Sequence, residues 1–138
     1  MTKLKKREYK LGDIIWVNLK GESHIQRGIR PAVIVQNNVG NKFSPTIQIV
    51  PLTSKLTKAG LPTHVRIPAN VGGLSKDSIA QCEGQRPINK TEIKGYIGKL
   101  PAQYIAKLSV ACIISTPIIK YLTQDEVIEV LEELPIPA

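Results

Sequence analysis

The fold is decided by residues 30–67, which read RPAVIVQNNVGNKFSPTIQIVPLTSKLTKAGLPTHVRI. Two apolar segments in this stretch, at 31–36 and 46–52, have the composition of β-strands, and a turn rich in Asn, Gly, Ser and Pro separates them. Strands joined in this way are expected to be antiparallel neighbours. We therefore expect Arg30 and Thr53 to lie at one edge of a sheet, where an arginine and a threonine can bind a phosphate.

The segments around this hairpin predict a mainly β chain that ends in helices. The further elements that we expect are strands at 14–19, 63–67 and 96–99, an irregular extended segment at 78–88, and helices at 101–115 and from 123 onward. The last helix has the clearest start, because Thr123 and Glu126 form a capping box. Short strands followed by C-terminal helices indicate an α+β fold, built on a strongly curved antiparallel sheet or a small half-open barrel.

Length, composition and charge limit what this chain can be. At 138 residues, 42% of them hydrophobic and 22% charged, it is expected to form one globular domain. Its net charge of +8 indicates a polyanionic partner. All 19 basic residues lie at or before Lys120, and five acidic residues follow it. We therefore divide the chain into a basic arm at 1–11, a main domain at 12–116 and an acidic helix at 117–138, which can serve packing, an oligomer contact or occlusion of the site.

The cysteines and the apolar segments indicate a reducing, non-membrane environment. Cys82 and Cys112 are too far apart for a CxxC metal pair and too few for a disulfide framework, so we interpret both as reduced, buried residues. No signal-peptide core follows the basic N-terminus. The longest apolar run, near 110–119, is interrupted and is shorter than the ~20 residues that span a bilayer. We expect a cytoplasmic protein without a membrane partner.

Five segments of the chain carry a resemblance to a known family. They are GDIIWVNL at 12–19, RGIRPAVIVQN at 27–37, NVGNKFSPT at 38–46, PLTS at 51–54 and LPTHVRI at 61–67. Together they resemble the MazF/PemK family of toxin endoribonucleases, over roughly residues 12–115. The resemblance implies an SH3-like barrel core, a homodimer, cleavage of single-stranded RNA (mRNA) at short sequences with no metal or cofactor, and neutralisation by a cognate antitoxin.

RNA cleavage of this kind gives the protein three tasks. The 2′-hydroxyl attacks the adjacent phosphate, so the protein must stabilise a charged phosphorane, deprotonate one oxygen and protonate another. Arg30 falls on the family's catalytic arginine, and its planar fork can hold two phosphate oxygens. Thr53 falls on the family's catalytic threonine and would donate a hydrogen bond to the scissile phosphate.

The general base is where this chain departs from its relatives. The family often has Gly-Ser-Glu-Gln before the arginine, and the aligned residues 23–26 read Ser-His-Ile-Gln, which lack the carboxylate. His24 titrates in a suitable range and can replace it, although a lone loop histidine is also commonly just solvated. Glu22 is a weaker candidate.

Candidate RNA-binding residues lie in the expected turn and near residue 86. Asn37, Asn41, Lys42, Phe43 and Ser44 offer amides, charge and an aromatic face to unpaired bases, and ordinary turn chemistry explains them equally well. Arg86 matches a basic position of the family, whereas the role of Gln85 stays open. For His64 a structural role is the better interpretation.

Three classes of function remain open from the sequence. The first is a toxin endoribonuclease that depends on Arg30 and Thr53. The alternative is a non-catalytic nucleic-acid-binding toxin, or a gyrase-inhibitor-like toxin on the same fold, which the missing carboxylate favours. A metal-dependent enzyme is disfavoured, because no cluster of Asp, Glu and His has ligand-like spacing.

Overall fold

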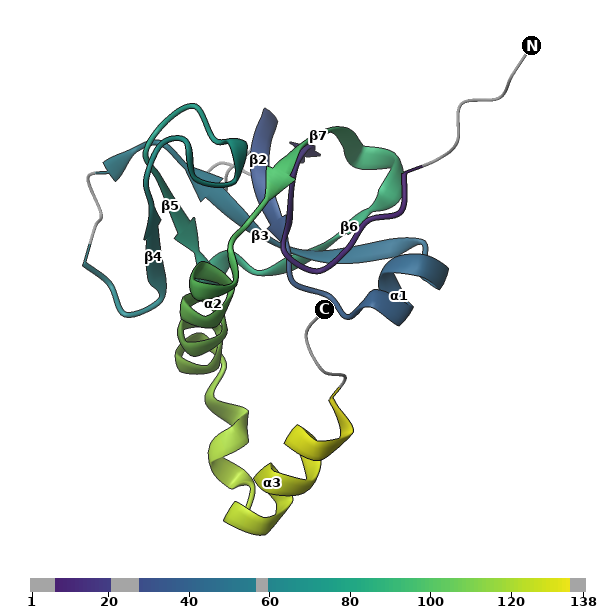
Figure 1. Ribbon diagram of the computed structural model, residues 1–138, viewed down its shortest axis with the longest axis vertical. Helices are drawn as coiled ribbons and strands as arrows, with labels where there is room; N and C mark the ends of the chain where they lie inside the picture. The colour runs from purple at the N-terminus through teal and green to yellow at the C-terminus, as the bar shows by residue number, and fades with distance from the viewer. Residues whose placement is uncertain (1–6, 21–27, 57–59, 135–138) are drawn as a thin grey trace.

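The centre of the protein is a single antiparallel sheet, followed by helices (Figure 1). The computed structural model describes residues 7–20, 28–56 and 60–134. Within them the strands are β1 (Asp13–Leu19), β2 (Gly28–Ile34), β3 (Thr46–Thr53), β4 (His64–Ile67), β5 (Ser78–Gln81), β6 (Arg86–Asn89) and β7 (Ile93–Lys99). The helices are α1 (Asn38–Phe43), α2 (Ala102–Ser115) and α3 (Gln124–Glu133), with 3₁₀ turns η2 (Val71–Gly73), η3 (Cys82–Gly84), η4 (Lys90–Glu92) and η5 (Pro117–Tyr121).

Strand β3 joins two arms of the sheet. The strand order is β4-β5-β3-β2-β1-β7, with β6 also paired to β3. One edge of β3 pairs with β2, while its other edge pairs first with β6 and then with β5. The antiparallel pairing of β2 with β3 confirms the prediction made from residues 30–67. The order is an open path from β4 to β7, so the sheet is not closed.

The curved sheet buries side chains on both of its faces. Alternate residues of a strand point to opposite faces, so one strand can serve two cores. One core is enclosed by β1, β2, β3, β6 and β7, and its buried members are Ile15, Val17, Leu19, Ala32, Ile34, Ile47 and Ile49. The other lies beneath α2, where Leu108 and Ala111 pack against Val33, Val50 and Leu52. These two cores confirm the predicted class, mainly β with C-terminal helices.

Several predicted elements differ from the structure, among them β2, which is predicted at 31–36 and spans Gly28–Ile34. The turn expected at 37–45 contains a short helix, α1, whose N-cap Asn37 accepts a hydrogen bond from the Gly40 amide at 2.9 Å. The irregular segment at 78–88 is two strands, β5 and β6, separated by η3, because β3 is long enough to pair with both. Strand β7 begins at Ile93, three residues before the predicted start.

The C-terminal helix begins as the capping box predicts. Glu126 N donates to Thr123 Oγ1 at 3.2 Å, and Thr123 N donates to Glu126 Oε1 at 3.1 Å, which lowers the pKa of Glu126. Its apolar side chains are largely exposed, Leu131 by 61%. In Figure 1, α2, η5 and α3 lead away from the sheet. Among the described helices, none is long and apolar enough to cross a membrane.

Both cysteines are free thiols, as predicted. Cys82 is buried in the core beneath α2, whereas Cys112 on α2 is only half-buried. The two thiols contact each other, and this contact raises the pKa of Cys82 and lowers that of Cys112. The expectation that both are buried is therefore correct for Cys82 only.

Candidate active site

The register of β2 and β3 places Arg30 and Thr53 toward the same end of this pair of strands. The paired residues are Ile34 with Ile49, Val33 with Val50 and Ala32 with Pro51. Arg30 and Thr53 each lie two residues beyond the last of these pairs, where Arg30 pairs with Val17 of β1 and Thr53 pairs with Ile79 of β5. That the guanidinium and the hydroxyl act on one phosphate stays a prediction.

The Thr53 hydroxyl is oriented by the backbone that follows it. Its Oγ1 accepts a hydrogen bond from Lys55 N at 3.2 Å. A hydroxyl can accept and donate at the same time, so this bond leaves the hydroxyl hydrogen available to a group outside the strand. Thr53 is half-buried, and it is held on its other side by pairing with Ile79 of β5. The side chain thus has the geometry of a donor at the rim of the sheet.

A cavity of about 570 Å³ opens beside Arg30. Its lining includes Trp16 from β1, Ser54 just after β3, and Lys76 between η2 and β5. Trp16 is 41% exposed although its neighbours on β1 are buried. An aromatic ring, a hydroxyl and an ammonium group beside an arginine suit an unpaired base and its phosphate. Sequence reasoning did not find Trp16 and Lys76, because a tryptophan in an apolar strand looks like a core residue.

A larger cavity of about 680 Å³ lies between the sheet and α2. Val33, Ile105, Leu108 and Cys112 are among its apolar lining residues. Among the described residues that line it, none is basic and none is aromatic. A polyanion is therefore matched by the smaller cavity beside Arg30 rather than by this one.

Arg86 shares a sheet face with the two predicted catalytic residues. It pairs with Ile49, which pairs in turn with Ile34, so its side chain lies on the same face as those of Arg30 and Thr53. Arg86 is half-buried, and burial lowers the pKa of its guanidinium. Its pairing places Arg86 beside β3 at Ile49, four residues along that strand from Thr53, and RNA binding by Arg86 stays a prediction.

His64 has the structural contacts expected of it. Its Nε2 lies 2.9 Å from Glu83 Oε2, and the same carboxylate oxygen accepts a hydrogen bond from Thr63 Oγ1 at 3.0 Å. The histidine side chain is 5% exposed. These contacts tie β4 to η3, which supports the structural interpretation of His64.

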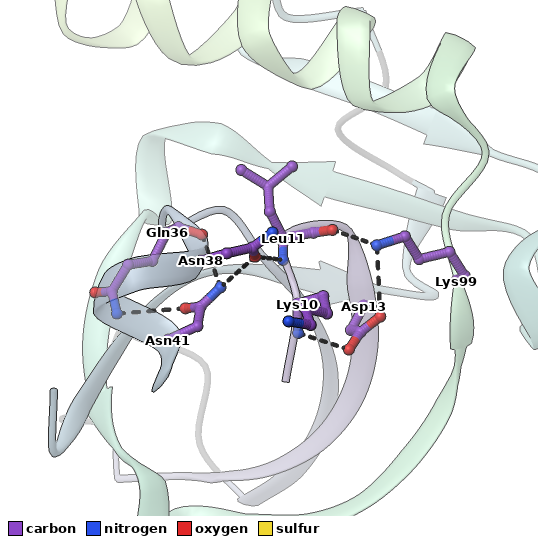
Figure 2. Close-up of polar contacts among 7 residues, drawn as sticks. All are labelled: Lys10, Leu11, Asp13, Gln36, Asn38, Asn41 and Lys99. Atoms are coloured by element: carbon purple, nitrogen blue, oxygen red, sulfur yellow. Dashed lines mark hydrogen bonds and ion pairs between the residues drawn. The ribbon is translucent and has the colours of Figure 1, made fainter. Parts of the chain in front are cut away.

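Three of the five predicted RNA-binding residues near α1 use their polar groups inside the protein. Figure 2 shows Asn41, which is 2% exposed, donating from Nδ2 to Gln36 O at 2.9 Å and to Asn38 Oδ1 at 3.2 Å. Asn37 caps α1, and Ser44 Oγ lies 3.1 Å from the Thr46 hydroxyl. These contacts favour the turn-chemistry interpretation for all three.

Asn37, Lys42 and Phe43 are the exposed residues of that predicted set. They lie at the far end of the β2–β3 hairpin from Arg30. At about 3.3 Å per residue, the chain from Arg30 to Asn37 spans roughly 20 Å. The structure therefore does not bring α1 next to Arg30 and Thr53. His24, the predicted base, lies outside the described residues, six positions before Arg30.

Comparison with known proteins decides the family. Residues 10–115 match the family described as PemK-like, MazF-like toxin of type II toxin-antitoxin system. The chain belongs to this toxin family. The toxin is 35% identical over 113 residues to endoribonuclease EndoA of Bacillus subtilis (strain 168), which covers 81% of this chain and 97% of that protein. It is also 40% identical over 84 residues to endoribonuclease MazF of Staphylococcus saprophyticus, covering 60% and 70% of the two chains.

Solved structures share the fold of this toxin. A crystal structure of MazF from Deinococcus radiodurans superposes with a TM-score of 0.71 at 21% identity, covering 82% of this chain and all of the other. An endoribonuclease in complex with its cognate antitoxin, from a mycobacterial species, gives a TM-score of 0.67 at 21% identity and covers 80% and 96%. The family and fold inferred from the resemblance are therefore confirmed. Helix α3 lies beyond the residues that match the family.

Proposed function

We propose that this toxin cuts single-stranded RNA through attack of a 2′-hydroxyl on the adjacent phosphate, with no metal ion in the reaction. Endoribonuclease activity is the class named for both of its sequence relatives. The observation that supports the mechanism is the antiparallel pairing of β2 with β3, because Arg30 and Thr53 each lie two residues beyond its Ala32–Pro51 pair. The cavity beside Arg30 offers Trp16 to a base and Lys76 to a phosphate, although Thr53 is not among its lining residues.

The main task of the protein in this reaction is to bind and stabilise the phosphate as charge develops on it. As the 2′-oxygen bonds to phosphorus, the phosphorane gains charge on its equatorial oxygens. The Arg30 fork can hold two of these oxygens, and the Thr53 hydroxyl can donate to one of them. The bond from phosphorus to the 5′-oxygen then breaks, leaving a 2′,3′-cyclic phosphate and a 5′-hydroxyl.

Two protons must move during this exchange. The 2′-hydroxyl loses one as it attacks, and the departing 5′-oxygen gains one. A guanidinium is a poor base, since its pKa is above ~12. We propose His24 as the base, because its imidazole titrates near neutral pH and stands on the segment that leads into Arg30. We propose that Arg30 also protonates the leaving oxygen.

The partners follow from the family and the charge. We propose neutralisation by a cognate antitoxin, supported by the antitoxin complex of the mycobacterial endoribonuclease that shares this fold. Homodimerisation and action in the cytoplasm, where mRNA is found, are proposals of the same kind. The net charge of +8 supports a polyanionic substrate. The gyrase-inhibitor-like alternative is not favoured, because both sequence relatives are endoribonucleases.

A cleavage assay in EDTA tests the proposal. A long single-stranded RNA is incubated with the wild type, Arg30→Ala and Arg30→Lys, and the ends of the products are mapped. The wild type should cut at short recurring sequences and leave cyclic phosphate ends. Arg30→Ala should cut at least ~100-fold more slowly, because it loses bonds to a charged group. Arg30→Lys keeps the charge but loses the fork, so it should also be slow. RNA that is bound yet uncut by the wild type would reject the proposal.

A further inference from the structure

A single row of side chains crosses the sheet at Thr53. Thr53 pairs with Ile79 of β5, and Ile79 pairs with Arg66 of β4. The row therefore reads Thr53, Ile79, Arg66 across three strands. Residues directly opposite each other in a sheet point to the same face. Arg66 therefore lies on the same face of the sheet as Thr53.

The spacing of the strands separates the role of Arg66 from that of Arg30. Neighbouring strands are about 4.8 Å apart, so the Cα of Arg66, two strands away, lies about 10 Å from that of Thr53. Ile79, which stands between them, is uncharged and buried. At this distance Arg66 faces a different phosphate from the one that Arg30 and Thr53 hold.

The surroundings of Arg66 leave it suited to an anion. Its side chain is 63% exposed, and its Nη2 donates to Asp77 Oδ2 at 3.3 Å. This contact uses one of several N–H donors on the guanidinium, and exposed ion pairs are weak. The other Asp77 oxygen, Oδ1, accepts a hydrogen bond from Ala69 N at 2.7 Å, which fixes the carboxylate. The Ala69 amide and Arg66 together lower the pKa of Asp77, so the pair is formed at neutral pH.

We propose that Arg66 binds a phosphate of the RNA away from the cleaved linkage, so that the RNA backbone crosses the strands along this row. The inference rests on the proposed function, because it takes the RNA to pass over Thr53. Arg66 acts in this picture as a substrate-positioning residue, which contributes to affinity and leaves the chemical step to Arg30 and Thr53.

Binding of an uncleavable RNA at several salt concentrations tests the inference. The probe is a fluorescent, single-stranded RNA of mixed sequence with every 2′-hydroxyl methylated, and binding is followed by anisotropy. For Arg66→Ala, the slope of log affinity against log salt should fall by about 0.7, the value for one phosphate contact with a single strand. Affinity should weaken by about tenfold, as for the loss of a charge-assisted bond. Asp77→Asn removes the negative charge beside Arg66 but can still accept from Ala69 N, so it should bind more tightly.

Lys94→Ala is the matched control. Lys94 is exposed on β7, at the opposite end of the strand order from β4, and its loss changes the net charge by the same amount. It should leave the slope unchanged. If Arg66→Ala leaves the slope unchanged, or if both variants lower it equally, the inference is overturned. Thermal melts of all variants show whether each one is folded.

A parallel cleavage assay keeps this inference separate from the proposed function. With a cleavable RNA in EDTA, Arg66→Ala should raise KM, whereas Arg30→Ala should lower kcat. If the wild type does not cut RNA and only Arg66→Ala lowers the slope of log affinity against log salt, phosphate binding by Arg66 is supported and the ribonuclease mechanism is rejected. A wild type that cuts, together with an Arg66→Ala variant of unchanged KM and slope, would reject the row and leave the mechanism standing.

Discussion

Replacing Thr53 with valine tests the active-site geometry most directly. The change exchanges a hydroxyl for a methyl group and keeps the shape and the β-branching of the side chain. In the protein, it removes the acceptor for Lys55 N, which is exposed and can turn to water, so the variant should fold normally. At the site, it removes one donor to a charged phosphorane. Hydrogen bonds to charged groups contribute about 1.5–3 kcal/mol, so kcat should fall by roughly 10- to 150-fold.

The assay is single-turnover cleavage, in EDTA, of a short RNA that contains one mapped site. Thr53→Ser is the control, because it keeps the hydroxyl and should retain most of the wild-type rate. The Arg30→Ala, Thr53→Val double variant shows whether the two groups act on one phosphate. If they do, its loss in rate should be smaller than the product of the two separate losses. A Thr53→Val variant that cuts at the wild-type rate would refute the geometry.

Three further substitutions or modifications test the fold and its chemistry. Asn41→Ala should lower the free energy of unfolding by about 1–3 kcal/mol, measured by denaturant titration, because its buried amide makes three hydrogen bonds with Gln36 and Asn38; an unchanged midpoint would contradict this. Gly98→Ala would place a methyl group 2.1 Å from a backbone oxygen of η2, so it should lower the free energy of unfolding by about 3 kcal/mol. In Gly95→Ala the nearest atom to the added methyl group is 3.4 Å away, so this control variant should melt at a much higher temperature than Gly98→Ala. At neutral pH, iodoacetamide should modify Cys112 before Cys82, because the contact between the two thiols lowers the pKa of Cys112 and raises that of the buried Cys82. Equal labelling of the two cysteines in peptide mass maps would contradict this.

The parts of the fold that the sequence predicts correctly are those set by local pattern. Two apolar segments and a turn predict the β2–β3 pair, and Arg30 and Thr53 each lie two residues beyond its last paired residues. The capping box predicts the start of α3, because its two hydrogen bonds lie within one turn of the chain. In each case the deciding interactions join residues that are close in sequence.

The parts that it misses depend on side-chain bonds and strand pairing that residue composition does not reveal. Asn, Gly and Ser favour a turn at 37–45, yet α1 forms there because the Asn41 side chain bonds back to Gln36 and the helix packs beside β3. The exposure of Trp16 has no local signal, since it depends on a cavity formed with residues after β3 and after η2. The division of 78–88 into β5 and β6 depends on the length of β3, which both strands share.

Arg30 and Thr53 are positioned by strands β2 and β3, which explains why the loss of the family's carboxylate from the loop before Arg30 is compatible with catalysis. Arg30 and Thr53 stand on strands, and the buried neighbours Ala32 and Leu52 anchor those strands in opposite cores. Phosphate binding by residues on paired strands does not depend on the sequence of residues 23–26. Those residues can supply only the base, so exchanging the usual carboxylate for His24 should alter proton transfer and leave phosphate binding intact. The pH at which cleavage rises should therefore lie near the pKa of a histidine, about 6.5, rather than near that of a carboxylate, about 4. A His24→Gln variant with the same pH profile would assign the base to another group, while Arg30 and Thr53 would keep their roles.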